Sequence, residues 1–122
     1  MKLVTERREP VIFFTSDLHF CHDKDFIWRP RGFFGAEAMT RGLVENYNLI
    51  VAPDDEVYIL GDCIMSDTER GLYYMRKLNG KIHIICGNHD TPAKIAAYKK
   101  LPQVVEICDA KYLDIGKFHF YL

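Results

Sequence analysis

Polar side chains that can bind metal ions follow three separate apolar runs of this sequence. The first cluster is Ser16-Asp17-Leu18-His19, with His22 shortly after it; the others are Gly61-Asp62 and Gly87-Asn88-His89-Asp90. Carboxylates, an amide oxygen and imidazoles form a mixed oxygen and nitrogen ligand set. Such a set suits manganese, iron or zinc and differs from a thiolate-type structural zinc site. The sequence therefore predicts a metal centre, provided that the fold brings the clusters together.

The spacing within the clusters predicts how an ion is held. In an extended segment, residues i and i+2 point to the same side. We therefore expect Asp17 and His19 to hold one ion together while Leu18 points into the core. The carboxylate of Asp62 can bridge two ions, and Asn88 offers a neutral oxygen. The glycines that open the second and third clusters permit close approach of the backbone to a ligand.

The elements around the clusters alternate between strands and helices. Short β-prone runs at 11–15, 56–60 and 81–86 end directly before the clusters. Apolar residues at helical spacing predict a helix over 36–50. This alternation predicts βαβ units with a mainly parallel sheet, and a ligand site outside the carboxyl ends of its strands. The clusters are therefore expected to meet at one edge of the sheet.

Two further helices are predicted after the second and third strands. A capping box that begins at Ser66 starts the first, which we expect to close at Asn79-Gly80. Thr91-Pro92 starts the second, which should end near Leu101-Pro102. Beyond it lie β-prone runs, with a turn at Gly116. These later runs are 104–107, 111–115 and 117–122.

Each of these residues also has a structural interpretation. Aspartate and asparagine are common in turns and helix caps, so any one cluster alone favours that role; the three clusters together favour a site. His83 and His119 alternate with apolar residues within predicted strands and are interpreted as structural. The pairs Phe33-Phe34 and Tyr73-Tyr74 are interpreted as core or partly buried packing.

Composition restricts the classes of function. The 122 residues are 48% hydrophobic and 27% charged with a formal net charge of -1, which is ordinary for one globular domain. No strong nucleic-acid binding and no membrane span are expected. Residues 1–10 lack a secretory apolar core, so a cytoplasmic location with reduced cysteines is predicted. The cysteines form no Cys-x-x-Cys pair and are interpreted as small buried side chains.

The three clusters, in this order and each after a strand, resemble the first motifs of the calcineurin-like metallophosphoesterases. The resemblance runs from about Phe13 to Asp90, and the bacterial phosphodiesterase-like members also match at His22 and at Arg29-Pro30. It implies a β-sandwich flanked by helices, of which this chain supplies the N-terminal βαβαβα part and some following strands. It also implies hydrolysis of phosphomonoesters or phosphodiesters, by a hydroxide held between two divalent ions.

The resemblance implies a role for each matched residue. Asp17 and His19 would bind the first ion, Asp62 would bridge both ions, and Asn88 would bind the second. His89 would protonate the leaving oxygen. The phosphate contacts would be His22 and Arg29. The ions would be manganese, iron, zinc or nickel, and the substrates would be phosphate esters, nucleotides among them.

The chain also departs from the family pattern. Two later histidine motifs that complete both metal shells are absent, so we expect residues 1–122 to be a C-terminally truncated domain that binds at most one ion well and turns over little. Met65 stands where many relatives have an acid that orients the catalytic histidine, which leaves Asp67 or Asp90 for that role. Cys21 stands where relatives often have glycine and adds a thiol near the metal.

Two questions stay open at the level of sequence. The alternative function is a non-catalytic scaffold that binds protein partners through the same fold. The substrate is also undecided, because the motifs would bind the phosphoryl group that all phosphate esters share. Specificity would come from the irregular, aromatic-rich segment 20–35 and from parts outside this chain.

Overall fold

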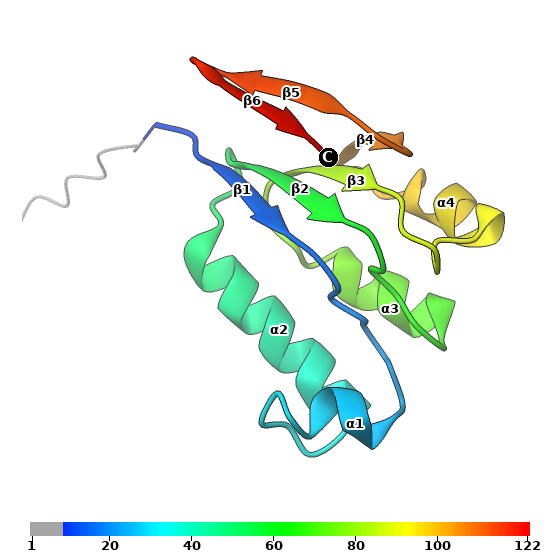
Figure 1. The fold of residues 1–122 in the computed structure, drawn as a ribbon. Helices are drawn as coiled ribbons and strands as arrows, with labels where there is room; N and C mark the ends of the chain where they lie inside the picture. Colours follow the sequence, from blue (N-terminus) through cyan, green and yellow to red (C-terminus); the bar gives the residue numbers. More distant parts are fainter. Residues whose placement is uncertain (1–8) are drawn as a thin grey trace, which may run out of the picture.

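The computed structural model describes residues 9–122 and has an α/β architecture (Figure 1). Its centre is a parallel sheet in the order β1-β2-β3-β4, as the alternation of elements predicted. The strands are β1 (Ile12–Thr15), β2 (Glu56–Leu60), β3 (Lys81–Ile85) and β4 (Val104–Cys108). The helices are α1 (Asp25–Trp28), α2 (Ala36–Ile50), α3 (Thr68–Met75) and α4 (Pro92–Tyr98).

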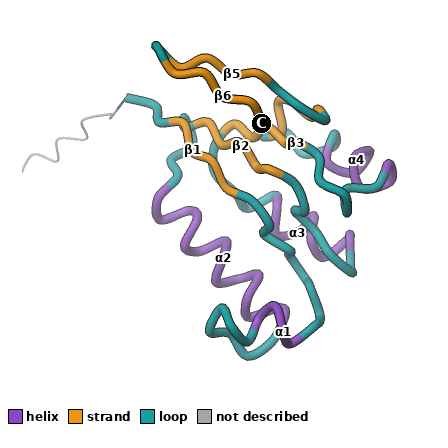
Figure 2. Tube along the Cα trace, in the orientation of Figure 1, coloured by secondary structure: helices purple, strands orange, loops and turns teal. Residues whose placement is uncertain are grey.

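A separate antiparallel hairpin completes the described chain. It consists of β5 (Tyr112–Ile115) and β6 (Phe118–Tyr121), joined at Gly116, whose φ of 58° suits a turn. In Figure 2 the hairpin lies on one side of the sheet, and α2 and α3 lie on the other. Across residues 9–122, no helix is long and apolar enough to cross a membrane. The predicted lack of a secretory signal concerns residues 1–10, of which 1–8 are outside the described part.

Alternation along the strands gives the sheet a helix-covered face that forms the core. Val57 and Ile59 of β2 lie beside Ile82 and Ile84 of β3, and all four side chains are at most 1% exposed. Side chains of the helices close over them. The helical members of this core are Val44, Leu72, Tyr74, Met75 and Tyr98, with Leu43, Tyr47 and Ala97 packed against them. This face fixes the register of the strands, because a one-residue slip would turn the core side chains outward.

The helix boundaries differ partly from the sequence predictions. Helix α2 spans the predicted range, and Thr91 caps α4 by accepting from the Lys94 N–H. The cap of α3 is Asp67, whose carboxylate accepts from the Arg70 N–H, so the predicted start at Ser66 is wrong by one residue. Both later helices are also shorter than predicted. They end at Met75 and at Tyr98, because tight turns rather than further helical turns lead into the next strands.

The opposite face of the sheet carries one row of side chains across its strands. The ring of Phe14 stacks on Tyr58 at 5.5 Å, and Tyr58 stacks on His83 at 4.2 Å. The His83 ring nitrogens lie 3.0 Å from Glu56 Oε1 and 2.8 Å from Glu106 Oε1. His83 therefore joins three strands, which agrees with the structural role predicted for it.

The hairpin is held over this row by few contacts. Lys111 Nζ lies 2.6 Å and 2.8 Å from the two Glu106 carboxylate oxygens. The ring of Phe120 packs against Phe14 at 5.4 Å. His119 pairs with Asp114 across the hairpin at 2.6 Å, where both side chains are exposed. Glu106 is therefore the main ionic contact between the sheet and the segment that leads to the hairpin.

We predict that the Glu106→Gln variant is less stable than the wild type only when carboxylates are ionised. Hydrogen bonds from Lys111 and then from His83 lower the pKa of the Glu106 carboxyl. A lowered pKa in the folded state stabilises the protein above the unfolded-state pKa, and this contribution is lost as the pH falls through the folded-state pKa. By urea unfolding, the free energy of unfolding of the variant should be roughly 1 kcal/mol below that of the wild type at neutral pH. This difference should disappear below about pH 4.

The matched control is Glu45→Gln, which removes an exposed carboxylate from α2. Its free energy of unfolding should follow the wild type at each pH. If Glu106→Gln lowered the free energy of unfolding equally at acidic and neutral pH, the contribution of Glu106 would not depend on its charge.

Candidate metal centre

The first and second clusters lie side by side because the β1–β2 pairing continues beyond the strand ends. Past Thr15, the N–H groups of Asp17, His19 and Phe20 donate to the carbonyls of residues 61, 62 and 63 at 3.3, 3.0 and 2.9 Å. This extension carries the Asp17-x-His19 motif along the loop that holds Asp62. The two clusters are therefore placed together by backbone hydrogen bonds alone.

The local backbone of the ligand residues is left-handed, so the prediction of an extended segment is wrong. Asp17, His19 and Asp62 have φ of 54°, 52° and 52°. Leu18 is 8% exposed and packs in the core, as predicted. Left-handed φ at residues other than glycine costs on the order of 1 kcal/mol each and is concentrated at functional sites.

Arg31 braces the first loop in this conformation. Its Nη2 donates to the Asp17 carbonyl at 2.9 Å, and its Nη1 donates to the Leu18 carbonyl at 3.0 Å. These carbonyls belong to the strained part of the backbone, so the guanidinium offsets some of its cost. Sequence reasoning singled out Arg29-Pro30 and missed Arg31, which carries no motif of its own.

Three donor atoms converge where the loops meet. His19 Nε2 lies 3.7 Å from Asp17 Oδ1 and 3.9 Å from Asp62 Oδ2. One donor atom from each of these residues lies within 4.8 Å of the other two. The side chain of Asp17 is 60% exposed, whereas those of His19 and Asp62 are 18% and 13% exposed. The cluster therefore has a buried floor and one side open to solvent.

The distances fit a shared metal ion better than they fit hydrogen bonding. Separations of 3.7 and 3.9 Å are too long for hydrogen bonds. Ligands at about 2.0–2.2 Å from one ion lie up to about 4 Å apart, so the spacing suits a common ion. Among the described residues, the buried His19 Nδ1 has no hydrogen-bond partner. The His19 ring is therefore oriented by packing, without the hydrogen-bond acceptor at Nδ1 that metal-binding histidines usually have.

Asp90 links the second and third clusters through a buried carboxylate that is 8% exposed. Its Oδ2 accepts from the Gly87 N–H at 2.8 Å and from the Asp62 N–H at 3.0 Å. Its Oδ1 accepts from the hydroxyl of Tyr98, on α4, at 2.9 Å. One side chain thus joins both loops to a helix. Asp90 was predicted as a possible orienting partner of His89; its observed contacts are with these loops.

Glycine is required where the two loops touch. A Cβ on Gly61, which has φ of 80°, would lie 2.8 Å from the Gly87 Cα. A Cβ on Gly87 would lie 2.6 Å from Asp62 Oδ1. The close approach observed is between the two loops, and the predicted approach of the backbone to a ligand stays a prediction.

The third cluster presents Asn88 and His89 at the surface of this junction. The His89 N–H donates to Asp62 Oδ1 at 3.1 Å, and the His89 carbonyl accepts from Lys94 Nζ at 3.0 Å. Lys94 also donates to the Ile64 carbonyl at 2.8 Å, so it ties both loops to α4. Both side chains of the Asn88-His89 pair are exposed. The backbone of His89 is held by these contacts, and its side chain is exposed to solvent.

His22 lies beside the cluster, and Arg29 lies further out. The His22 ring is 5.7 Å from the His19 ring, and its Nδ1 accepts from the Lys24 N–H at 3.2 Å. Desolvation and then the nearby charge of His19 lower the pKa of His22, which favours a neutral ring with the proton on Nε2. Arg29 is 73% exposed at its side chain and pairs with Asp25 at 3.5 Å, so its predicted phosphate contact stays a prediction.

Cys21 follows the first loop and also has a left-handed backbone, with φ of 65°. Glycine adopts this conformation most readily, so the residue type is an exception at this position. The residue is 9% exposed, and burial raises the pKa of its thiol. Cys21 and Cys63 are buried, as predicted, whereas Cys86 and Cys108 are only half-buried.

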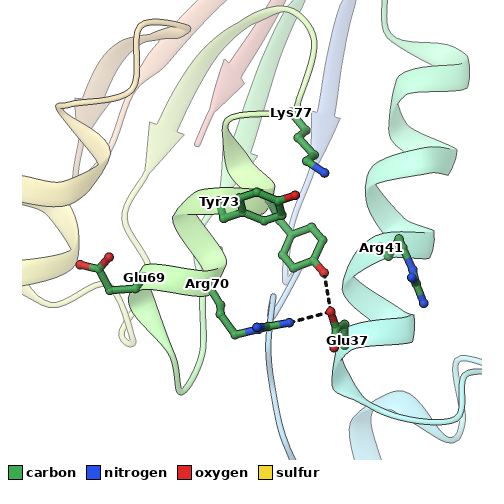
Figure 3. Close-up of a pocket in the computed structure, with 7 residues that line it drawn as sticks. Glu37, Arg41, Glu69, Arg70, Tyr73 and Lys77 are labelled. Carbon is green, nitrogen blue, oxygen red and sulfur yellow. Dashed lines mark hydrogen bonds and ion pairs between the residues drawn. The ribbon is translucent and has the colours of Figure 1, made fainter.

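A polar hollow of about 590 Å³ lies between α2 and α3, away from the predicted residues (Figure 3). At this hollow, Glu37 of α2 accepts from Arg70 at 2.6 Å and from the Tyr74 hydroxyl at 3.2 Å, both on α3. These contacts link the two helices. Tyr73 is 54% exposed at this hollow, so its predicted burial is wrong, whereas Tyr74 is buried.

Comparison with known proteins gives relatives without an assigned function. Over 81 residues, which are 65% of this chain, the sequence is 38% identical to an uncharacterized protein of Methanocaldococcus jannaschii and covers 46% of it. The fold matches the crystal structure of a protein of unknown function from Aquifex aeolicus with a TM-score of 0.70 and 25% identity. That match covers 90% of this chain and 57% of the Aquifex chain. No family model matches the sequence.

The chain thus spans about half the length of these two relatives. The structural match supports the α/β fold described above over nearly the whole chain.

We predict that Asp90→Asn destabilises the protein by about 2–3 kcal/mol. An amide has one accepting atom, so it leaves either the two loop N–H groups or the Tyr98 hydroxyl without its acceptor in a buried place. Tyr98→Phe, which removes only the hydroxyl, should cost about 1 kcal/mol. Urea unfolding measures both changes.

The control for charge is Asp109→Asn, at an exposed position beyond β4. Its free energy of unfolding should stay within about 0.5 kcal/mol of the wild type. If Asp90→Asn were no more harmful than Asp109→Asn, Asp90 would not be the link between the loops.

Proposed function

We propose that this chain carries the catalytic metal-binding half of a calcineurin-like metallophosphoesterase that hydrolyses phosphate esters. The observation that supports this most directly is the convergence of Asp17, His19 and Asp62, whose donor atoms lie within 4.8 Å of one another. They converge at the carboxyl ends of parallel strands, where α/β folds bind ligands. The order of the motifs along the chain supports the same proposal.

The donor atoms are carboxylate oxygens and an imidazole nitrogen, a combination that suits manganese, iron or zinc. Asp17, His19 and Asp62 would hold the first ion. Asn88 would contribute to the second, because the turn that carries it is bonded to Asp62 through the His89 N–H. Divalent ions at such a site supply Lewis-acid activation of a nucleophile and neutralise charge on the phosphoryl group.

The remaining residues have roles that follow from their positions. His89 has a fixed backbone and an exposed ring, so it would deliver a proton to the leaving oxygen without rearrangement of its loop. His22 accepts at Nδ1 from the Lys24 N–H, which leaves an Nε2–H to donate to a phosphoryl oxygen. The His89 side chain is exposed and that of His22 is partly exposed, so both are accessible to a substrate.

The donors found in residues 9–122 are enough for one ion and too few for two complete shells. We therefore infer that this chain binds one ion well at most and hydrolyses esters slowly. The matched part makes up about half of each relative, and the unmatched part of such a protein would carry the remaining ligands.

We predict that Asp62→Asn lowers manganese affinity at least tenfold, because the amide brings no charge to the ion. Calorimetric titration with Mn²⁺ measures affinity and stoichiometry, and hydrolysis of bis-p-nitrophenyl phosphate in the presence of manganese measures turnover. The expected results are about one ion per wild-type chain, and slow hydrolysis that Asp62→Asn abolishes.

Asp109→Asn is the matched control, because it removes one carboxylate outside the cluster. It should change neither the affinity nor the rate. Two stoichiometric ions with rapid turnover would contradict the incomplete shells. Absence of metal binding, or rates that do not respond to Asp62→Asn, would reject the phosphoesterase and favour a scaffold.

A further inference from the structure

The segment that follows the loop with Asp17 and His19 exposes large aromatic side chains. Phe26 is 67% exposed and Phe34 is 97% exposed, against the partly buried packing predicted for Phe34. Trp28 lies between them in the sequence and is half-buried. We call residues 22–34 the aromatic segment. Exposed aromatic rings gathered in one segment are typical of surfaces that stack a ligand.

A continuous line of rings connects this segment to the candidate metal centre. The ring of His22 lies 5.7 Å from that of His19 and also 5.7 Å from the ring of Phe26. The His22–Phe26 contact is edge-on, at 72° between the ring planes. Phe26 is thus two ring contacts away from a metal-ligating residue, and most of its surface is open to solvent.

The aromatic segment is fixed to the same loop that holds the ligands. Arg31 donates to the carbonyls of Asp17 and Leu18, and the Phe33 N–H donates to the Trp28 carbonyl at 3.0 Å. These bonds fix the backbone of the segment relative to the first loop, and the ring of Phe26 is in addition in contact with that of His22. Such preorganisation is what a specificity surface requires.

The outer part of the segment adds a hollow with a positive charge. It has a volume of about 330 Å³ and is lined by Trp28, Arg29 and Phe34. The Arg29 guanidinium lies 5.7 Å from the centre of the Trp28 ring. Planar groups and anions are the ligands that this combination of side chains attracts.

We propose that the aromatic segment binds the flat ring of the substrate, and that the substrates are phosphate esters of a nucleoside. The proposal rests on the proposed function, since it requires the phosphoryl group at Asp17, His19 and Asp62. The ring of the ester stacks on Phe26 while His22, between Phe26 and His19, donates to a phosphoryl oxygen. Esters of small aliphatic alcohols would lack the first of these contacts.

The experiment compares AMP with ribose 5-phosphate on the manganese-loaded chain, because these ligands differ only in the base. Calorimetric titration should give at least tenfold tighter binding of AMP, as expected for one base stacked on an aromatic ring. Phe26→Ala should reduce the ratio of the two affinities, AMP over ribose 5-phosphate, to near one and leave the affinity for ribose 5-phosphate unchanged. Tyr73→Ala, at an exposed ring on α3, should leave the ratio as it is in the wild type.

Equal affinities for AMP and ribose 5-phosphate would overturn the proposal, as would equal effects of Phe26→Ala and Tyr73→Ala on the ratio. Failure to bind manganese is a different result, which rejects the metal centre. The ring site is then tested with adenosine alone, by chemical-shift changes at Phe26. Their absence at millimolar adenosine would overturn the ring site as well.

Discussion

The buried carboxylate of Asp90 is the contact on which the candidate site depends. Parallel strands bring their carboxyl ends to one edge, but this alone leaves the following loops free to diverge. Asp90 accepts from the backbone of Asp62 and of Gly87, and Tyr98 holds it from α4. The His89 N–H, two residues after Gly87 in the same loop, donates to Asp62 Oδ1 and so helps to orient the Asp62 carboxylate.

The same junction explains the unusual backbone of the site. Left-handed conformations at Asp17, His19 and Asp62 turn the side chains toward one point. These conformations persist because backbone hydrogen bonds hold the two loops together and the guanidinium of Arg31 holds the first loop. Strain of this kind is maintained only where the surroundings determine the conformation, and a cluster of it at converging donors is typical of a functional site. The site is therefore built by backbone hydrogen bonds between the loops together with the side chains of Asp90 and Arg31.

Much of the fold and part of the site could be predicted from the sequence. Apolar runs that end directly before polar clusters indicated the parallel sheet, and helical periodicity gave the bounds of α2. The left-handed backbone at Asp17 could not be predicted, because it depends on pairing with a loop more than 40 residues away in sequence. Arg31, Lys94 and Tyr98 were missed because each acts through a contact outside its own element and carries no motif.

Pulsed electron paramagnetic resonance of the Mn²⁺ complex tests whether Asp17, His19 and Asp62 bind one metal ion. We expect a nitrogen coupling from one imidazole. This coupling should disappear in His19→Gln and remain in His22→Gln, whose ring lies beside the cluster without belonging to it. A spectrum of fully hydrated manganese, or a nitrogen coupling that survives His19→Gln, would contradict the account.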